Sequence, residues 1–227
     1  MQFMATLYFN KSSIFMIQNL RENYDLAQLE RDQLTENPIE LFERWFNFAL
    51  EQKVLEPNAM TLATVNAEGK PTARIVLFKG FDDKGFVFYT NYDSQKGQNL
   101  ANTPFAALLF NWLELHKQIR IEGKVERLDP DLSTKYFQSR PKGSQIGAWA
   151  SPQSQVIEDR TILEKNTAEL ESKYQNVPHL PRPPHWGGYI VEPTLIEFWQ
   201  GRPSRLHDRF RYTKNESGNW QIDRLAP

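Results

Sequence analysis

The chain has 227 residues, and its 27 lysines and arginines nearly balance its 28 aspartates and glutamates, which leaves a formal charge of -1 at pH 7. This balance excludes a globally basic nucleic-acid binder, so any site for an anion must be built by local clustering of cations. The chain contains no cysteine, which excludes disulfides, thiolate nucleophiles and iron–sulfur clusters and fits a reducing compartment.

Residues 1–19 are interpreted as an N-terminal extension of the folded domain. Polar residues interrupt its apolar runs, and it lacks the basic start of a signal peptide. Translation could begin at Met1 or at Met16. No apolar run in the chain approaches the ~18 residues of a membrane span. We therefore expect a cytoplasmic protein, with residues 20–227 as a single domain.

Residues 17–53 are predicted to be helical. Within this stretch, PIELFERWFNFALEQKV repeats apolar residues at helical spacing, and we expect that face to pack on the core. The face consists of Ile39, Leu41, Phe42, Trp45, Phe46 and Ala49.

From Met60 the hydrophobic period changes to that of strands. The runs MTLATV, RIVLFKGF and FVFYT are separated by turn sequences, as is typical of hairpins. A short helix is expected at SQKGQNLAN, and two further strands at FAALLFNW and QIRIEGKVERL. Residues 60–128 are thus predicted to form an antiparallel meander that could close into a barrel.

The remaining residues are predicted to mix helices and strands. DPDLSTKYFQSRP indicates a helix that is capped by Asp129 and ended by Pro141. A surface helix is expected at DRTILEKNTAELESKYQ, and the proline-rich VPHLPRPPHWGG indicates an extended connection. Strands follow at GYIVEP and TLIEFWQ, and RLHDRFRYT is expected to pair with NWQIDRLAP. No long linker divides the chain, which indicates one β-rich α+β domain with surrounding helices.

The segment IEFWQGRPSRLHDRFRY gathers cations and aromatic rings. If RLHDRFR is a strand, one of its faces carries Arg205, His207, Arg209 and Arg211. Such a row is typical of a solvated edge strand, where charges discourage aggregation. It is equally what a planar anionic ligand would need, and the rings of Phe198 and Trp199 favour this second interpretation.

Three other segments contain candidate phosphate ligands. Tyr136 and Arg140 lie four residues apart, on one side of a helix end, and Ser144 follows the break at Pro141. An arginine at this position can instead satisfy the last carbonyls of its helix.

The other two segments lie earlier in the chain. Arg74 and Lys79 are five residues apart, so they face opposite sides of a regular strand and could share a ligand only across a bulge or strand end. Thr90 and Lys96 lie where a strand gives way to a helix start, which attracts phosphate, although a surface turn is the ordinary alternative.

Several common cofactor motifs are missing. The chain has neither G-x-G-x-x-G nor a P-loop, which disfavours dinucleotides and nucleoside triphosphates as ligands. Its four histidines are not grouped with carboxylates at metal-ligand spacing, so no metal is expected.

Taken together, these segments resemble the pyridoxamine 5'-phosphate oxidase family. IEFWQGRPSRLHDR matches the family signature of aliphatic, Glu, aromatic, Trp, Gln, four variable residues and Arg-aliphatic-His-Asp-Arg. RIVLFKG, FYTNY, SRPKGSQIGAW and WQIDRLAP are also similar, in the same order, over residues 20–227. The resemblance implies an FMN-binding split β-barrel with surrounding helices. It also implies a homodimer that holds FMN in clefts between its subunits.

The resemblance further assigns roles to individual residues. Arg205 and His207 are the catalytic candidates, expected to face the pyridine ring of the substrate and its reacting substituent. Arg21 and Tyr24 match an N-terminal segment that closes over the substrate. The substrate phosphate is assigned to Lys79, Tyr136, Arg140 and Ser144. FMN is assigned to Arg74, Lys79, Tyr89, Thr90, Lys96, Gln118, Gln153, Ser154, Trp199 and Arg209.

Three departures from the family pattern affect this assignment. Gln95 stands where the family usually has an arginine before Lys96, so FMN is expected to bind more weakly unless Lys96 and Arg74 suffice. Glu56 replaces a common Asp and is left outside the site. Glu22 and Asn23 only partly match the closing segment.

The implied activity is the oxidation of pyridoxamine or pyridoxine 5'-phosphate to pyridoxal 5'-phosphate. A hydride would pass from C4' to N5 of FMN, and O2 would reoxidise the flavin to give hydrogen peroxide. Three alternatives are a split-barrel flavoprotein with another substrate, a non-catalytic carrier of flavin or pyridoxal phosphate, and a nucleic-acid-binding barrel. The candidate phosphate ligands disfavour the first alternative, and the charge balance disfavours the last.

Overall fold

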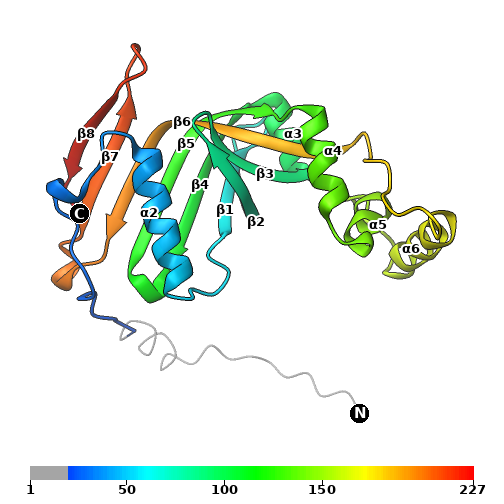
Figure 1. The fold of residues 1–227 in the computed structure, drawn as a ribbon, viewed down its shortest axis with the longest axis horizontal. Helices are drawn as coiled ribbons and strands as arrows, with labels where there is room; N and C mark the ends of the chain where they lie inside the picture. The colour runs from blue at the N-terminus through cyan, green and yellow to red at the C-terminus, as the bar shows by residue number, and fades with distance from the viewer. Residues whose placement is uncertain (1–19) are drawn as a thin grey trace.

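The computed structural model describes residues 20–227, and the predicted extension with both candidate start positions lies outside them (Figure 1). The α-helices are α2 (Pro38–Glu51), α3 (Gln95–Asn102), α4 (Pro130–Ser139), α5 (Lys142–Ala150) and α6 (Thr161–Lys173). The strands are β1 (Ala59–Val65), β2 (Pro71–Asp82), β3 (Gly85–Asn91), β4 (Phe105–Trp112), β5 (Lys117–Arg127), β6 (Trp186–Gln200), β7 (Asp208–Lys214) and β8 (Trp220–Leu225). Short 3-10 turns are η1 (Arg31–Gln33), η2 (Leu113–Leu115) and η3 (Pro203–Arg205). None of the described helices is both long and apolar enough to span a membrane.

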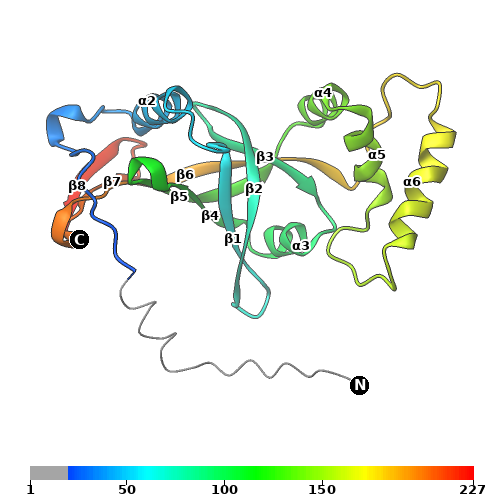
Figure 2. The same cartoon turned by 90° about the horizontal axis from the view of Figure 1, so that it is seen from below.

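Six antiparallel strands close into a barrel. They run in the order β3-β2-β1-β4-β5-β6, and pairing of β3 with β6 completes the ring. The hairpin β7–β8 continues the sheet beyond β6, as predicted. Both views place this hairpin at one end of the molecule and helices α4–α6 at the other (Figures 1 and 2). Closure into an antiparallel barrel is confirmed, but the meander predicted for residues 60–128 is not, because β4 pairs with β1 instead of β3 and the later strand β6 is needed to complete the ring.

Helix α2 covers the barrel core with the predicted apolar face. Asn37 caps the helix by accepting a hydrogen bond from the Ile39 amide, and Pro38 occupies the first turn. The ring of Phe42 is fully buried, with ring centroids 4.8 Å from Phe86 and 5.2 Å from Phe110. The predicted face is confirmed, and only its Phe46 remains partly exposed.

The predicted helix over residues 17–53 is wrong for most of residues 20–37, and its first three residues lie outside those that the structure describes. The α-helix begins only at Pro38, and residues 20–30 have no regular secondary structure. The backbone amide of Leu29 shows the reason, because it donates at 3.1 Å to the carboxylate of Asp208 rather than to a helical carbonyl. Contacts with the C-terminal hairpin thus replace helical hydrogen bonds in this segment.

Two further boundaries differ from the prediction. Helix α5 follows α4 almost at once, because the fixed φ of Pro141 starts a second helix as readily as it ends the first. The strands predicted at GYIVEP and TLIEFWQ form one 15-residue strand, β6. A register shift at Glu122 and Gly123 of β5, opposite Pro193, lets that proline lie within a paired strand.

Candidate functional site

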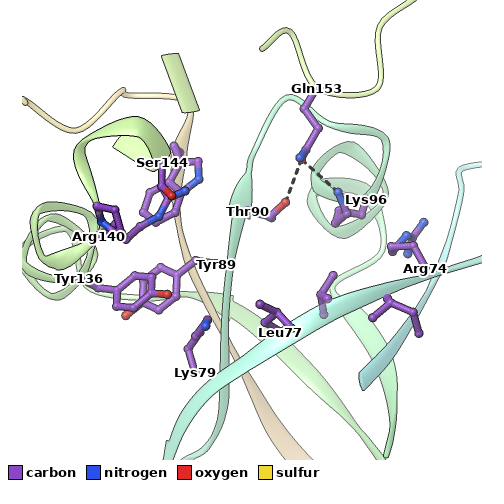
Figure 3. Close-up of a pocket in the computed structure, with 14 residues that line it drawn as sticks. Arg74, Leu77, Lys79, Tyr89, Thr90, Lys96, Tyr136, Arg140, Ser144 and Gln153 are labelled. Carbon is purple, nitrogen blue, oxygen red and sulfur yellow. Dashed lines mark hydrogen bonds between the residues drawn. The ribbon is translucent and has the colours of Figure 1, made fainter. Parts of the chain in front are cut away.

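A cavity of about 500 Å³ lies where β2, β3, α3, α4 and α5 meet (Figure 3). Four cationic side chains line it, and none of its lining residues is acidic, which favours an anionic ligand. Figure 3 shows Tyr136, Arg140 and Ser144 on one side of the cavity, and Arg74 and Lys96 on the other. The lining residues are Arg74, Ile75, Val76, Leu77, Lys79, Tyr89, Thr90, Lys96, Tyr136, Arg140, Pro141, Ser144, Gln153 and Trp186.

Arg74 projects from β2 and contacts only neutral groups. Its guanidinium donates to the Leu62 carbonyl at 3.1 Å and to the hydroxyls of Thr64 and Thr72 at 2.8 Å each. Burial lowers the pKa of Arg74 from its ordinary value. Within residues 20–227 no carboxylate forms an ion pair with it, so its charge remains available to a ligand.

Lys96 enters the cavity from the first turn of α3. Ser94 caps this helix, and the Lys96 ammonium donates to the Ser94 hydroxyl at 3.3 Å and to Oε1 of Gln153 at 3.1 Å. Thr90 donates to the same Gln153 oxygen at 3.1 Å, so the structure brings these three predicted FMN ligands together (Figure 3). Desolvation, followed by the charge of Arg74, lowers the pKa of Lys96. An anion beside Lys96 and Arg74 would raise the pKa of Lys96, because it would offset both the desolvation of the ammonium and its repulsion by Arg74.

Lys79 lines the cavity beside an irregularity of β2. The register between β2 and β3 shifts between Phe78 and Gly80, which leaves Lys79 as the extra residue. Arg74 and Lys79 both line the cavity despite their spacing of five residues, and so do three of the four residues between them, so both faces of β2 contribute to its lining.

The wall of the cavity opposite Arg74 and Lys96 contains stacked aromatic rings and a guanidinium group with one unpaired nitrogen (Figure 3). Tyr89 and Tyr136 stack with ring centroids 3.9 Å apart, and Arg140 lies 4.7 Å from the ring of Trp186. One terminal nitrogen of Arg140 is buried and has no hydrogen-bond partner in the part of the chain that the structure describes. Buried donors are rarely left unpaired, so this nitrogen indicates a missing acceptor such as a phosphate oxygen.

A second group of predicted residues lies away from this cavity. Gln118, Trp199 and Arg209 are direct cross-strand neighbours on β5, β6 and β7, so their side chains share one face of the sheet. None of the three lines the cavity, and neither does Ser154, which is exposed and has a left-handed φ of 71°. One chain therefore does not bring all the predicted FMN ligands together.

The predicted strand face with Arg205 and His207 is wrong. Strand β7 begins only at Asp208, and the preceding residues form η3, in which Ser204 and Arg205 have left-handed φ values of 57° and 62°. Pro203 lacks a backbone N–H and cannot continue the strand ladder, so it favours the turn. Arg205 is exposed on this turn.

Only Arg209 and Arg211 remain on the predicted strand face, and both are paired with carboxylates. Arg211 contacts Asp223 at 3.2 Å, and Arg209 donates to the buried Glu197 at 2.7 Å. Burial alone would raise the pKa of Glu197, but hydrogen bonds from Arg209 and Arg120 outweigh it and hold that pKa below its ordinary value. Part of the charge of Arg209 is thus already neutralised.

His207 lies in a cluster of aromatic rings at this turn. Its ring is 4.5 Å from Trp199 and 5.6 Å from Tyr24, and its Nδ1 lies 3.1 Å from the Arg202 amide nitrogen, whose N–H it accepts. Desolvation, then the charges of Arg205 and Arg209, lower the pKa of His207.

Two other positions from the sequence analysis and several unpredicted ones complete the description. Arg21 is exposed, and Gln95 is exposed and donates to Asn99 at 3.0 Å, outside the cavity. Sequence reasoning missed the apolar part of the lining, which comprises Ile75, Val76, Leu77, Pro141 and Trp186. The alternation of strand β2 could have indicated that Ile75 and Leu77 share one face.

Comparison with known proteins identifies the family. Residues 47–174 match the family model described as pyridoxamine 5'-phosphate oxidase, and residues 186–227 match the pyridoxine 5'-phosphate oxidase C-terminal dimerisation region. The chain belongs to the pyridoxamine 5'-phosphate oxidase family. The resemblance drawn from the sequence motifs, and the expectation of an enzyme, are confirmed.

Curated relatives are similar over nearly their whole length. The pyridoxine/pyridoxamine 5'-phosphate oxidase of Salinibacter ruber is 55% identical over 210 residues, which cover 92% of this chain and 98% of the relative. That of Acaryochloris marina is 57% identical over 213 residues, which cover 93% and 95%. The chain therefore spans the same region as these members of the family.

Solved structures confirm the split-barrel fold. PhzG from Burkholderia lata, in complex with tetrahydrophenazine-1-carboxylic acid, has a TM-score of 0.83 and 34% identity, covering 89% of this chain and all of PhzG. A pyridoxamine 5'-phosphate oxidase-related, FMN binding protein from Nostoc punctiforme has a TM-score of 0.66 and 18% identity, covering 82% and 97%. The second likeness shows the fold alone.

Proposed function

We propose that this protein oxidises pyridoxamine or pyridoxine 5'-phosphate to pyridoxal 5'-phosphate with FMN as its cofactor. The observation that carries the proposal is the cavity lined by four cations and no carboxylate, in a chain whose overall charge is only -1. Two phosphate groups, one from the cofactor and one from the substrate, would compensate these charges. The names of the curated relatives support the same substrates.

The donor set around Lys96 fits the phosphate of FMN. Arg74 and Lys96 supply positive charge without a carboxylate partner among the described residues, and Thr90 and Gln153 add polar groups beside them. These residues come from β2, from β3 and α3, and from the segment after α5, so a bound phosphate would fasten several elements at once. Lys79 and Tyr89 would hold the remainder of the cofactor.

The opposite wall fits the substrate phosphate. Tyr136 and Arg140 come from the end of α4, and Ser144 comes from the first turn of α5. The buried nitrogen of Arg140 has no partner among the described residues and is available to donate to this phosphate. A phosphate held by these residues would provide binding energy, remote from the reacting carbon, that positions the pyridine ring.

We further propose that the working form is a homodimer. The C-terminal residues match a region described as a dimerisation region, and the predicted FMN ligands fall into two groups that one chain keeps apart. The outer face of β2 leaves Ile75 and Leu77 64% and 41% exposed beside the cavity. A second chain that covers this face would bring its Gln118, Trp199 and Arg209 toward the cavity and enclose the cofactor.

The proposed chemistry divides between cofactor and protein. When bound, FMN supplies the redox step by accepting a hydride from C4' at N5 and passing the electrons to O2, which yields hydrogen peroxide. The protein positions the substrate, and Arg205 and neutral His207 offer donors to the ring and its reacting substituent. The guanidinium of Arg209 would stabilise negative charge on the flavin.

One experiment tests the proposal directly. The purified protein is examined for a flavin spectrum, then mixed with pyridoxine 5'-phosphate in air while aldehyde and peroxide are followed. We expect both products, and no reaction with unphosphorylated pyridoxine at the same concentration. A coloured protein that forms neither product is a carrier, and one that oxidises only a reduced phenazine carboxylic acid acts instead on the kind of ligand bound to PhzG.

A further inference from the structure

The carboxylate of Asp208 joins three separate segments of the chain. Its Oδ2 accepts the backbone N–H of Leu29 at 3.1 Å and the guanidinium of Arg202 at 3.3 Å, and its Oδ1 accepts from Arg224 at 3.2 Å. The side chain is buried, with 8% of the residue exposed. A single buried carboxylate thus connects the N-terminal segment, the turn before β7, and β8.

The N-terminal segment brings Tyr24 against His116 and against His207, one of the two proposed catalytic residues. The ring of Tyr24 lies edge-on to His116, with centroids 4.6 Å apart, and 5.6 Å from His207. Gly201 allows this approach, because a Cβ there would lie 2.8 Å from Cβ of Tyr24. Leu29 is the next buried residue along the segment, so its bond to Asp208 anchors the chain that carries Tyr24.

The turn before β7 is held by the same carboxylate. Arg202 bonds to Asp208 through its guanidinium and to Nδ1 of His207 through its backbone N–H. Ser204 and Arg205 have left-handed φ values of 57° and 62°, a conformation that is unfavourable for non-glycine residues and persists only where neighbouring contacts impose it. The contact between Asp208 and Arg202 is one such restraint.

We propose that Asp208 is a positioning residue that holds Tyr24 and His207 against each other. It acts through Leu29 on the segment that carries Tyr24, and through Arg202 on the turn that carries Arg205 and His207. This inference rests on the proposed function, in which those residues meet the substrate. A second ion pair, between Arg224 and Glu30 at 2.7 Å, reinforces the same junction.

The test compares Asp208→Asn with Asp223→Asn. Asparagine keeps the shape but loses the charge that three donors share, whereas Asp223 lies on the same hairpin and contacts Arg211 and Gln221 instead. For Asp208→Asn we expect KM for pyridoxine 5'-phosphate to rise by roughly tenfold, the loss typical of a charged hydrogen bond, with FMN affinity unchanged. Asp223→Asn should leave both quantities within twofold. Equal effects of the two variants on KM would overturn the proposal.

A double-mutant cycle separates positioning from a general structural effect. If Asp208 acts through Tyr24, its substitution should change KM little in a Tyr24→Ala background, because the group that it positions is already missing. Additive effects on KM would contradict this route. Should Asp208→Asn fail to fold, Arg202→Ala offers a second variant, because it removes the contact between Asp208 and the turn but leaves the hydrogen bond to Leu29. In that variant KM should still rise while FMN affinity is unchanged. An unchanged KM would contradict the proposal.

Hydrogen exchange tests the junction independently of catalysis. The Leu29 amide should exchange at least tenfold faster in Asp208→Asn than in Asp223→Asn, because asparagine offers one neutral acceptor oxygen for which Leu29, Arg202 and Arg224 would compete. Unchanged exchange would refute the junction itself. If the wild-type protein does not oxidise pyridoxine 5'-phosphate, the proposed function fails, but faster exchange confined to Asp208→Asn would still establish the junction.

Discussion

At the scale of single residues, the neighbours of His207 define its protonation state. Its Nδ1 accepts the Arg202 N–H, so the neutral ring carries its proton on Nε2. Desolvation, then the charges of Arg205 and Arg209, lower its pKa, while Asp208 acts in the opposite direction. His207 is therefore a neutral hydrogen-bond donor near pH 7, rather than the cation that a row of basic residues suggests.

We predict that His207 titrates below about 6.5, the value of a free imidazole. Because a second proton would have to enter the occupied Nδ1 position, kcat/KM should be constant above this pKa and fall as the pH drops through it. Substitution Arg205→Gln removes one opposing cation and should raise the pKa of His207. NMR titration of the ring and a pH–rate profile measure these effects, and an unchanged pKa in the variant would contradict this account.

The unpaired nitrogen of Arg140 leads to a second prediction. Arg140→Met should raise KM for pyridoxine 5'-phosphate by roughly 10–100-fold, because a charged hydrogen bond to phosphate is lost. The exposed Arg160, which pairs with Glu164 on the protein surface, offers a matched control in Arg160→Met. Steady-state kinetics measure both variants. A similar KM in the two would show that Arg140 does not hold the substrate phosphate.

Lys117 is a buried cation, and the free-energy cost of burying its charge should lower the stability of the folded protein. Its ammonium lies 2.6 Å from Oε1 of Gln200 and 3.7 Å from the centre of the Trp45 ring, and burial lowers its pKa to about 8. The unfolded chain would bind this proton up to about pH 10.5. Stability should therefore be lowest below pH 8 and rise between the two pKa values, since the unfolded state binds more protons there.

Comparison with Lys117→Met isolates this contribution. From pH 7 to pH 9.5, the free energy of unfolding of the wild type should gain about 1–2 kcal/mol relative to the variant. Urea unfolding at the two pH values measures the difference. A constant difference between the two proteins would mean that the pKa of Lys117 is not lowered by folding.

At the scale of secondary structure, α3 shows how local geometry presents a charge. The Ser94 cap fixes the start of the helix, which places Lys96 at the cavity. Gly97 lets the helix approach the preceding loop, because a Cβ there would lie 2.0 Å from the Tyr92 carbonyl oxygen. The position of Lys96 thus depends on its neighbour having no side chain.

We predict that Gly97→Ala displaces α3, weakens FMN binding and destabilises the protein by about 1–3 kcal/mol, the usual cost of overpacking. Gly143→Ala is the matched control, since a Cβ in that helix meets nothing within 4 Å. That control should be neutral or stabilising by up to about 1 kcal/mol. Thermal unfolding and fluorescence titration with FMN would decide, and equal stability of the two variants would refute the close-contact argument.

At the scale of the whole molecule, the proposed FMN site would need a second chain, because one chain keeps the two groups of predicted ligands apart. Helices α4–α6 lie toward one end of the barrel, and the β7–β8 hairpin lies at the other (Figure 1). The cavity is lined by residues of α4 and α5 but by none of the hairpin. A two-fold axis would place each hairpin end near the cavity of the other chain. Cofactor binding and association should then be linked.

We predict that the protein is a dimer in solution and that its FMN affinity falls when it is diluted to the monomer. Ile75→Arg should favour the monomer, because it places a charge on the exposed apolar face of β2. Val156→Arg, at a fully exposed position, should remain dimeric. Sedimentation and flavin fluorescence at several protein concentrations test this prediction. Flavin affinity that does not depend on concentration, in a protein that stays monomeric, would contradict it.

The sequence by itself determined the elements with strong local signals and the family. The apolar face of α2, the Asp129 cap and the C-terminal hairpin depend on spacing and turn chemistry, which neighbouring residues encode. The long motif IEFWQGRPSRLHDR was sufficient to identify the family. Local sequence patterns predicted the wrong structure for residues 20–30, because the hydrogen-bond acceptor of the Leu29 amide, Asp208, lies far away in the sequence.

Only the tertiary structure decided which candidates meet. The convergence of Thr90 and Lys96 on Gln153, the closure of β3 on β6, and the packing of Tyr24 against His207 all depend on contacts between distant segments. The separation of the ligands into two groups has the same origin. Hydrophobic periodicity and secondary-structure propensity describe how one segment forms hydrogen bonds within itself or with its neighbour in the sequence. The site, in contrast, is formed where segments distant in the sequence satisfy each other's hydrogen bonds and charges.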